Sequence, residues 1–179
     1  MRVLLLLVFA VPLLAISARY VAAAPPVQIT GGGAGTFAAD LDGDGDVDGS
    51  QFGIGVRLLG GGEARGHFEC LMAGRSDILG LGLMAVQAKI TDGSVNGGSA
   101  TFSGTATILL TRSTLPGVPE GKFTEVPVEV TVTPGGPGVG TLTLTVIGAF
   151  DGAPGDTLVG NDNYDLPVET VLSGQIKIH

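Results

Sequence analysis

The sequence predicts an all-β fold, and three of its features lead to this prediction. Apolar and polar residues alternate with a period of two along most of the chain, which is typical of strands with one buried face. The 179 residues include 31 glycines and 10 prolines, which disfavour long helices. Segments rich in glycine, proline, asparagine and aspartate separate the alternating runs and are typical of tight turns. We therefore expect a single antiparallel β-sandwich of about eight strands, with an up-and-down β-barrel as the alternative.

The segment before the predicted β-domain, residues 1–23, has the features of a secretory signal peptide. Arg2 gives the segment a positively charged N-terminal region, an apolar run extends from Val3 to Ile16, and Ala23 ends a stretch of small residues. We place cleavage after Ala23, with an uncleaved membrane anchor as the alternative. No other run is apolar enough to span a bilayer. Residues 24–179 are then one β-domain that is secreted or held at the cell surface, in an extracellular or periplasmic location.

The first four predicted strands are based on the period-two alternation of apolar and polar residues. Residues 27–38 are strand-like but broken by glycines, and residues 51–59 carry apolar residues at every second position. In residues 64–72 and 83–91, apolar positions again alternate with polar ones. The apolar positions of the second, third and fourth strands are Phe52, Ile54, Val56, Leu58, Phe68, Cys70, Met84, Val86, Ala88 and Ile90.

The last four predicted strands cover residues 99–111, 123–133, 140–148 and 168–178. Pro127 lacks a backbone N–H, so we expect its strand to lie at a sheet edge or to contain a bulge. Because consecutive strands are close in sequence, antiparallel hairpins are the economical pairing. The apolar positions are Ala100, Phe102, Ala106, Ile108, Leu110, Val126, Val128, Val130, Val132, Leu142, Leu144, Val146, Ile176 and Ile178.

The chain is acidic, with a net charge of −8. Loss of Arg2 and Arg19 with the leader would change this charge to −10. Nucleic acid and anionic membrane surfaces are therefore poor partners, whereas cations are favourable ones.

The chain has one cysteine, Cys70, so it cannot form an internal disulfide. A domain of this size must then be held by its apolar core, with a bound metal as a further source of stability. Cys70 is either a reactive thiol or a small buried apolar residue, and its place in an alternating strand favours burial.

The segment "ADLDGDGDVDGSQ" places an aspartate at every second position and a glycine, Gly45, after the third. Calcium prefers six to eight oxygen ligands, and spaced carboxylates in a glycine-rich loop can surround one ion. Without a cation the aspartates would repel one another at close range. The sequence therefore predicts a calcium site whose ligands are Asp40, Asp42, Asp44, Asp46, Asp48 and Gln51.

This segment resembles the calcium loops of dockerins and EF-hand proteins over Asp40–Gln51. The resemblance implies ligands at loop positions 1, 3, 5, 7, 9 and 12, with Gly45 at the sharp turn. Position 12 is Gln51 rather than an acidic residue, which should weaken the site, and the sequence holds no second copy of the loop. A solvated acidic loop without an ion is the alternative, and cohesin binding is not implied.

The residues after the loop decide between an EF-hand helix and a strand. Apolar residues recur at every second position from Phe52 to Leu58, and Gly53 and Gly55 lie between them. Two interior glycines would cost a helix about 2 kcal/mol relative to alanine. We therefore expect the loop to join two strands, so its likeness to an EF-hand should be local.

A second acidic loop, residues 150–167, is a weaker candidate for a cation or sugar site. It carries Asp156, Asn161, Asp162, Asn163 and Asp165, but Leu166 replaces the turn glycine, and an ordinary polar loop is the alternative. Tyr164 in this loop could stack on a sugar. The two histidines, His67 and His179, are unpaired in sequence and give little support to a zinc site or a catalytic triad.

The segment from Gly97 to His179 resembles the C-terminal β-modules of uncharacterised secreted bacterial proteins. The resemblance implies a surface or extracellular domain and no particular activity. We therefore predict a non-catalytic, calcium-binding β-domain with a structural or adhesive role, whose partner is an extracellular glycan or protein. A carbohydrate- or small-ligand-binding module is the alternative, and a secreted hydrolase, which would need converging acids in a pocket, is less well supported.

Overall fold

The computed structural model describes residues 25–40, 47–73, 81–113, 120–153 and 155–179, and these residues form nine strands. Their bounds agree with the predicted strands to within a few residues, except that β4 continues five residues further and β8 was not expected. The strands are β1 (Val27–Thr36), β2 (Gln51–Gly60), β3 (Glu63–Ala73), β4 (Leu81–Asn96), β5 (Ser99–Ser113), β6 (Gly121–Thr133), β7 (Thr141–Val146), β8 (Tyr164–Asp165) and β9 (Glu169–Ile178).

All strand pairings are antiparallel, in the order β6-β5-β4-β3-β2-β1-β9-β7-β8, with a further pairing of β6 with β7. Strands β1 to β7 therefore form consecutive hairpin pairs, as predicted from their closeness in sequence. The last strand, β9, lies beside the first, and Gln28 and His179 exchange two backbone hydrogen bonds. The structure confirms the all-β class and the antiparallel arrangement.

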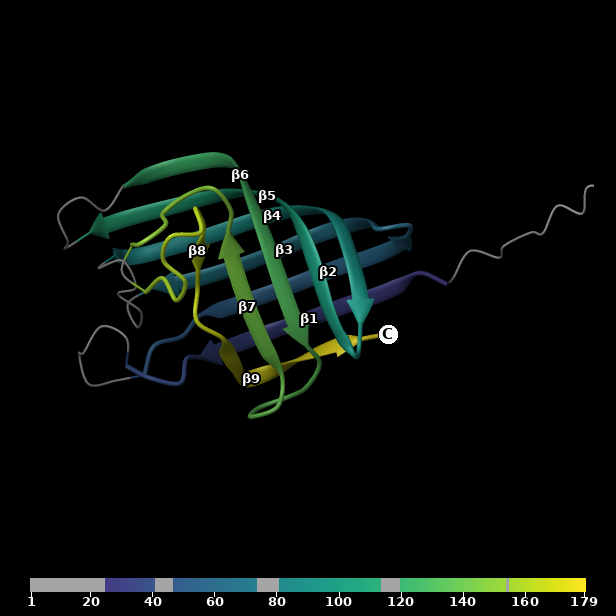
Figure 1. Ribbon diagram of the computed structural model, residues 1–179. Helices are drawn as coiled ribbons and strands as arrows, with labels where there is room; N and C mark the ends of the chain where they lie inside the picture. The colour runs from purple at the N-terminus through teal and green to yellow at the C-terminus, as the bar shows by residue number, and fades with distance from the viewer. Residues whose placement is uncertain (1–24, 41–46, 74–80, 114–119, 154) are drawn as a thin grey trace, which may run out of the picture.

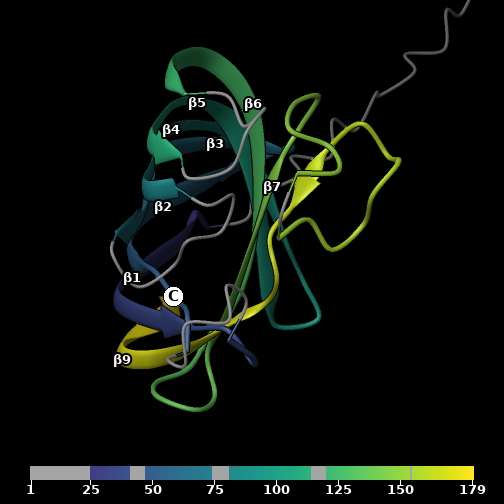
Figure 2. The same cartoon turned by 90° about the vertical axis from the view of Figure 1, so that its left-hand side faces the viewer.

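The sheet folds into two packed layers that share strands. Figure 1 shows β7 and the second half of β6 crossing in front of β1 to β3, and Figure 2 shows the two layers from the side. Strand β4 has 16 residues and β5 has 15, and both bend. The register of this pair shifts between Ile90 and Asp92. Such bulges let one strand pass from one layer to the other.

Strand β6 also bends, close to the proline that the sequence analysis singled out. The register with β5 shifts where Ala106 pairs with Val126 and Ile108 pairs with Phe123. Glu125, inside this shift, has a φ of 56°, which few residues other than glycine adopt. Pro127 lies just after this bulge and is exposed. Of the two predicted explanations for a proline in this strand, an edge position or a bulge, the structure confirms the bulge.

The core lies between the two layers and is built from the alternating apolar positions. Phe68 and Phe102 are fully buried and their ring centroids lie 6.3 Å apart. Cys70 is buried and His67 is exposed on the same strand, as the alternation predicts. Every residue that the alternation gives as an apolar strand position is buried, apart from Val126 and Ile178, which are partly buried against the core.

The hairpin between β4 and β5 shows how turn chemistry fixes the register. Asn96 pairs with Ser99, so the connection has two residues, Gly97 and Gly98, and their φ angles are 60° and 91°. A two-residue turn with positive φ at both positions matches the twist of the strands and requires glycine or a similar residue.

The part of the chain that the structure describes contains no apolar helix of the length needed to span a bilayer.

Candidate metal site at the β1–β2 connection

The predicted calcium loop connects β1 to β2, which pair with each other. Of the predicted ligands, Asp40, Asp48 and Gln51 are described, whereas Asp42, Asp44 and Asp46 lie outside the described residues. Phe52 to Leu58 belong to β2, so the loop is followed by a strand and the prediction against an EF-hand helix is confirmed.

Backbone hydrogen bonds join the two ends of this connection beyond the paired strands. The N–H of Gly35 donates to the carbonyl of Ser50 at 2.8 Å, and the N–H of Phe37 donates to the carbonyl of Asp48 at 2.9 Å. The hydroxyl of Thr36 also donates to the carbonyl of Asp48, at 3.3 Å. Phe37 is itself buried in the core. The two described ends of the connection, at Phe37 and at Asp48, are thus held side by side.

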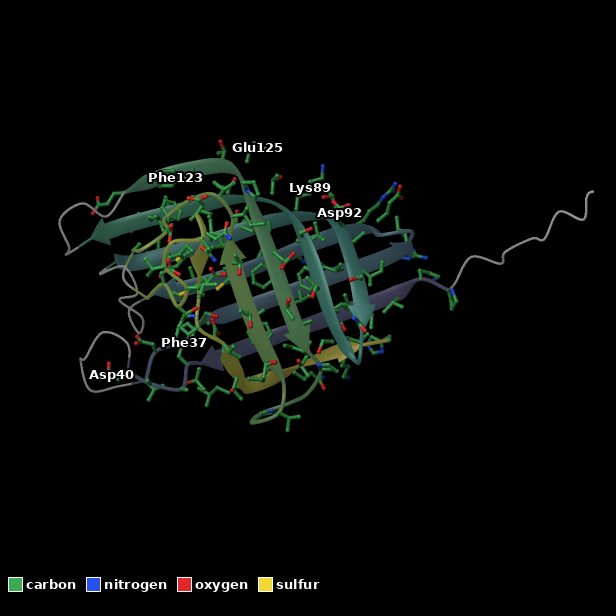
Figure 3. The ribbon with its side chains drawn as sticks, viewed as in Figure 1. Phe37, Asp40, Lys89, Asp92, Phe123 and Glu125 are labelled. Atoms are coloured by element: carbon green, nitrogen blue, oxygen red, sulfur yellow. The ribbon has the colours of Figure 1, made fainter. Side chains whose placement is uncertain are left out.

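The described candidate ligands differ in their surroundings. Asp48 is buried at the base of the connection, with 1% of its surface exposed. Asp40 is exposed, and Figure 3 shows it further out along the connection than Phe37. Gln51 is the first residue of β2 and is exposed. Within the described parts of the chain, no three acidic, histidine or cysteine side chains are grouped as they would be around a metal ion.

Beside the base of the loop lies a buried polar cluster that the sequence analysis missed. Ser50 and Glu169 are both buried, and the hydroxyl of Ser50 donates a 2.7 Å hydrogen bond to Oε2 of Glu169. Burial raises the pKa of Glu169 to about 7, although hydrogen bonds from the hydroxyl and the backbone of Ser50 act to lower it. Glu169 therefore changes between its neutral and its charged form near neutral pH although it is buried.

Cys70 completes this cluster from β3. Burial, and to a smaller extent the charge of Glu169, raise the pKa of its thiol well above the ordinary range, against a smaller opposite effect of the Ser50 hydroxyl. A thiol in this state is a poor nucleophile because the thiolate is the reactive form. Of the two interpretations of Cys70, the structure supports the buried apolar residue.

A small pocket opens on the outer side of the same region. Its volume is about 100 Å³, and it lies where β1, β2, β3 and β9 meet the connection. Its lining is mixed: Val47, Leu71 and Leu172 provide apolar side chains, and Thr36, Ser50 and Gln51 provide polar ones.

The second acidic loop is held together by its own side chains. Asp151 accepts N–H bonds from Gly160 at 2.7 Å and from Asp162 at 3.1 Å. Asp156 accepts N–H bonds from Gly152, Leu158 and Asp165. Partial burial acts to raise the pKa of Asp156, but these three bonds and a contact with Asp151 lower it by more, so its pKa is below the ordinary value. Two of the candidate carboxylates of this loop thus accept hydrogen bonds within it: Asp156 from backbone N–H groups and Asp165 from the side-chain amide of Asn161.

The prediction that Tyr164 could stack on a sugar is wrong. Its side chain is fully buried, because Tyr164 belongs to the short strand β8 and pairs with Val146 of β7. Burial raises the pKa of its phenol, with a smaller contribution from Asp156. His67 and His179 are both exposed, on β3 and at the C-terminus.

Comparisons with known proteins add no further assignment: no family model, no curated protein and no solved structure matches this chain.

Proposed function

We propose that this protein is a secreted, non-catalytic β-domain in which residues 40–51 bind one calcium ion, and that its role is structural or adhesive. The support for the ion is the alternate spacing of the five aspartates together with the closure of the loop at Phe37 and Asp48. Closure of this kind holds the chain just before the aspartate series beside Asp48, its last member, and a single ion requires its ligands to come together.

The observation that carries the proposal is the backbone bond from Phe37 to Asp48. It joins the chain just before Asp40 to the chain at Asp48, and the sequence places the other aspartates between these two points. Like charges this close along the chain repel one another, and a divalent cation removes this repulsion. The proposed ligands are the carboxylates of the aspartates, one backbone carbonyl and the amide of Gln51.

The non-catalytic role is supported by where the reactive groups of the described core lie. Cys70 has 2% of its surface exposed and Glu169 has 4%, so neither side chain reaches a substrate at the surface. The secreted location is supported by the leader-like residues 1–23. With a Kd of about 0.1 to 1 mM, typical of extracellular calcium modules, the site would be filled mainly outside the cell.

Calorimetric titration of the purified protein with calcium tests the proposal. At about 1 mM calcium, a Kd of about 0.1 mM would stabilise the fold by about 1.4 kcal/mol and raise Tm by roughly 4 °C. Magnesium should produce a smaller shift, because it demands a tighter octahedral geometry.

A variant carrying Asp42→Asn and Asp44→Asn should lose the calcium response. Asp92→Asn, on β4 away from the loop, should keep it and serves as the matched control. Absence of any heat of binding and of any calcium-dependent Tm shift in the unmodified protein would refute the calcium site.

A further inference from the structure

The outer face of β1 and its neighbours, on the left of Figure 2, has a gap in its rows of side chains. The register places Glu69 beside Gly53, Gly53 beside Gly32, and Gly32 beside Gln175. Residues paired in this way lie on the same face of a sheet. Glu69 and Gln175 are exposed, and the two glycines between them leave the backbone bare. We call Gly32 and Gly53 the glycine floor.

A shallow groove of about 340 Å³ lies beside this floor on β1 and β9. Gly32 belongs to its lining, and Thr30, Gln175, Lys177 and His179 add polar side chains. Its volume lies in the range of small-ligand sites.

The space above the other half of the floor is open as well. A Cβ atom added at Gly53 would meet no atom within 4 Å beyond its chain neighbours. A glycine inside a strand often marks a place where a ligand approaches the backbone closely. The floor and the groove together therefore have the form of a binding site on the surface of the sheet.

Both histidines of the chain lie next to the floor. His67 pairs with Gly55, and its ring lies over this glycine, because a Cβ atom there would be 2.8 Å from Cε1 of the ring. Gly55 pairs in turn with Thr30, whose hydroxyl is 3.4 Å from Nε2 of His179. Lys177 also pairs with Thr30 and is exposed. Three nitrogen-bearing side chains thus meet around Thr30 and Gly55.

Two arginines continue this basic side of the floor. Arg57 and Arg65 are exposed and face each other across β2 and β3. Like charges in a direct cross-strand pair are destabilising, and a bound anion would remove their repulsion. Arginine also matches the shape of a carboxylate with two parallel hydrogen bonds.

The acids near these cations lie on one side only. Glu63 and Asp92 pair with each other at the start of β3, beyond Arg65, and Glu69 borders the floor from β3. The described parts of β1, β2 and β9 carry no exposed acid, although the whole chain has a net charge of −8. The strip from Arg57 to Lys177 is therefore positive within an acidic protein.

We propose that the groove and the glycine floor bind an acidic oligosaccharide, with a sugar ring over the floor and uronate carboxylates held by Lys177 and by the Arg57–Arg65 pair. The proposal rests on the adhesive role proposed above and gives that role a partner. Sugar hydroxyls both donate and accept hydrogen bonds. Glu69 supplies an acceptor, and the amide of Gln175 supplies both kinds of group.

The surroundings of the floor favour an acidic sugar over other ligands. The aromatic side chains of the described residues lie in the core or pack against it, so recognition on this face depends on hydrogen bonds and charge. A large polyanion such as DNA would meet Glu69, Glu63 and Asp92 around the strip, and the net charge of the chain would repel it. A single oligosaccharide chain is narrow enough to stay on β9, β1 and β2.

Calorimetric titration of the purified protein with oligogalacturonate, a chain of uronic acids, tests the proposal. We expect a Kd of about 0.1–1 mM, because the groove is shallow and its charges are exposed. Added salt should weaken the binding. Maltohexaose, a neutral oligosaccharide, should bind at least about tenfold more weakly. A chelator in the buffer prevents calcium from bridging the uronates to the aspartate loop.

Gly53→Phe tests the floor, because the ring would occupy the open space above it. This variant should bind oligogalacturonate at least about tenfold more weakly. Its Tm should not decrease, since the added side chain meets no neighbour at Cβ and phenylalanine favours strands. Val95→Phe is the matched control. Val95 is 40% exposed on β4, outside the groove, so Kd should stay unchanged.

A double variant, Arg57→Gln with Lys177→Gln, tests the cations. It should weaken binding about tenfold, because each exposed charge pair contributes up to about fivefold. Its Tm should not decrease, since the loss of Arg57 also removes the repulsion with Arg65. Lys122→Gln, which changes an exposed cation on β6 outside the groove, should leave Kd unchanged.

Absence of binding at millimolar oligogalacturonate would overturn the proposal. So would equal affinity for maltohexaose, an unchanged Kd for Gly53→Phe, or tighter binding of single-stranded DNA or of phosphatidylglycerol vesicles. Because the chelator keeps the aspartate loop out of these titrations, their failure would leave the calcium proposal to its own titration.

Discussion

The hydroxyl of Ser50 lies 2.7 Å from Oε2 of Glu169 and donates a buried hydrogen bond to it, although 119 residues separate the two in sequence. Ser50 directly precedes β2, and Glu169 is the first residue of β9. The bond therefore ties the end of the β1–β2 connection to the last strand. Because the pKa of Glu169 is raised to about 7, its charge changes in the neutral pH range.

We expect the free energy of unfolding to decrease as the pH rises from about 4.5 to about 7. Glu169 binds its proton more tightly in the folded state than in the unfolded chain, where its pKa is 4.5. Its contribution is fully present below the unfolded pKa and is lost as the pH rises through the folded pKa. A shift of this size corresponds to about 3 kcal/mol. Urea unfolding at a series of pH values measures the decrease.

Glu169→Gln should abolish this decrease and make the protein more stable than the unmodified chain at pH 8. The exposed Glu129 provides the matched control, because Glu129→Gln should keep the pH dependence. If the Glu169→Gln protein lost stability between these pH values as steeply as the unmodified one, another group would be responsible.

Ser50→Ala should destabilise the protein, and more so at high pH. The variant removes the hydroxyl that hydrogen-bonds Glu169, and a bond to a charged acceptor is worth about 1.5–3 kcal/mol. Below the pKa of Glu169 the acceptor is neutral, so the loss should fall to about 1 kcal/mol. Denaturant unfolding at pH 5 and pH 8 compares the two losses.

Ser99→Ala is the control for that experiment. Ser99 and Thr133 form a partly buried hydroxyl pair at 3.2 Å, with no acid involved. The decrease in the free energy of unfolding caused by Ser99→Ala should be small and independent of pH. A pH-independent loss for Ser50→Ala as well would show that the Ser50 hydroxyl does not act through the charge of Glu169.

Most of the fold could be predicted from the sequence because the period-two alternation survives wherever a strand covers one face of the core. Val128, Val130 and Val132 are all fully buried, as their spacing indicates. The continuation of β4 to Asn96 could not be predicted, because residues 91–96 are mostly polar and exposed, and Val95 is the one large apolar side chain among them. That part of β4 is held by pairing with β5 rather than by burial.

The position of Glu169 could not be predicted because a bulge changes the alternation of β9. Ile176 faces the core, and strict alternation back from it would turn Glu169 outward. The unpaired Leu172 shifts the pattern by one residue, so Glu169 and Val171 face inward instead. No residue type in this segment marks the shift, and Gly174 is only a weak indicator.

We expect Gln51→Glu to increase the calcium affinity of the loop. In the loops that this segment resembles, position 12 holds an acidic residue that binds calcium through both oxygens. One additional close charge worth about 1.4 kcal/mol would lower Kd about tenfold. Calorimetric titration measures the change. Gln87→Glu, on the exposed side of β4, adds the same charge away from the loop and should leave Kd unchanged.

If Gln51→Glu bound calcium no more tightly than the unmodified protein, Gln51 would not occupy position 12 of the site. The calcium proposal would then rest on the aspartates alone, and titration of the Asp42→Asn, Asp44→Asn variant would decide it.

Asp151→Ala should loosen the loop between β7 and β8 without a large loss of global stability. The carboxylate of Asp151 accepts N–H bonds from Gly160 and Asp162, and both residues are exposed. Water can replace such a bond at low cost, so the free energy of unfolding should fall by only about 0.5–1.5 kcal/mol.

Hydrogen exchange of the Gly160 and Asp162 amides should nevertheless become faster in Asp151→Ala, because their protection depends on this one side chain. Asp92→Ala removes an exposed acid whose carboxylate bonds the neighbouring Thr91, and it should leave exchange in the loop unchanged. Unaltered exchange at Gly160 and Asp162 in Asp151→Ala would mean that the remaining bonds, such as those of Asp156, are sufficient to hold the loop.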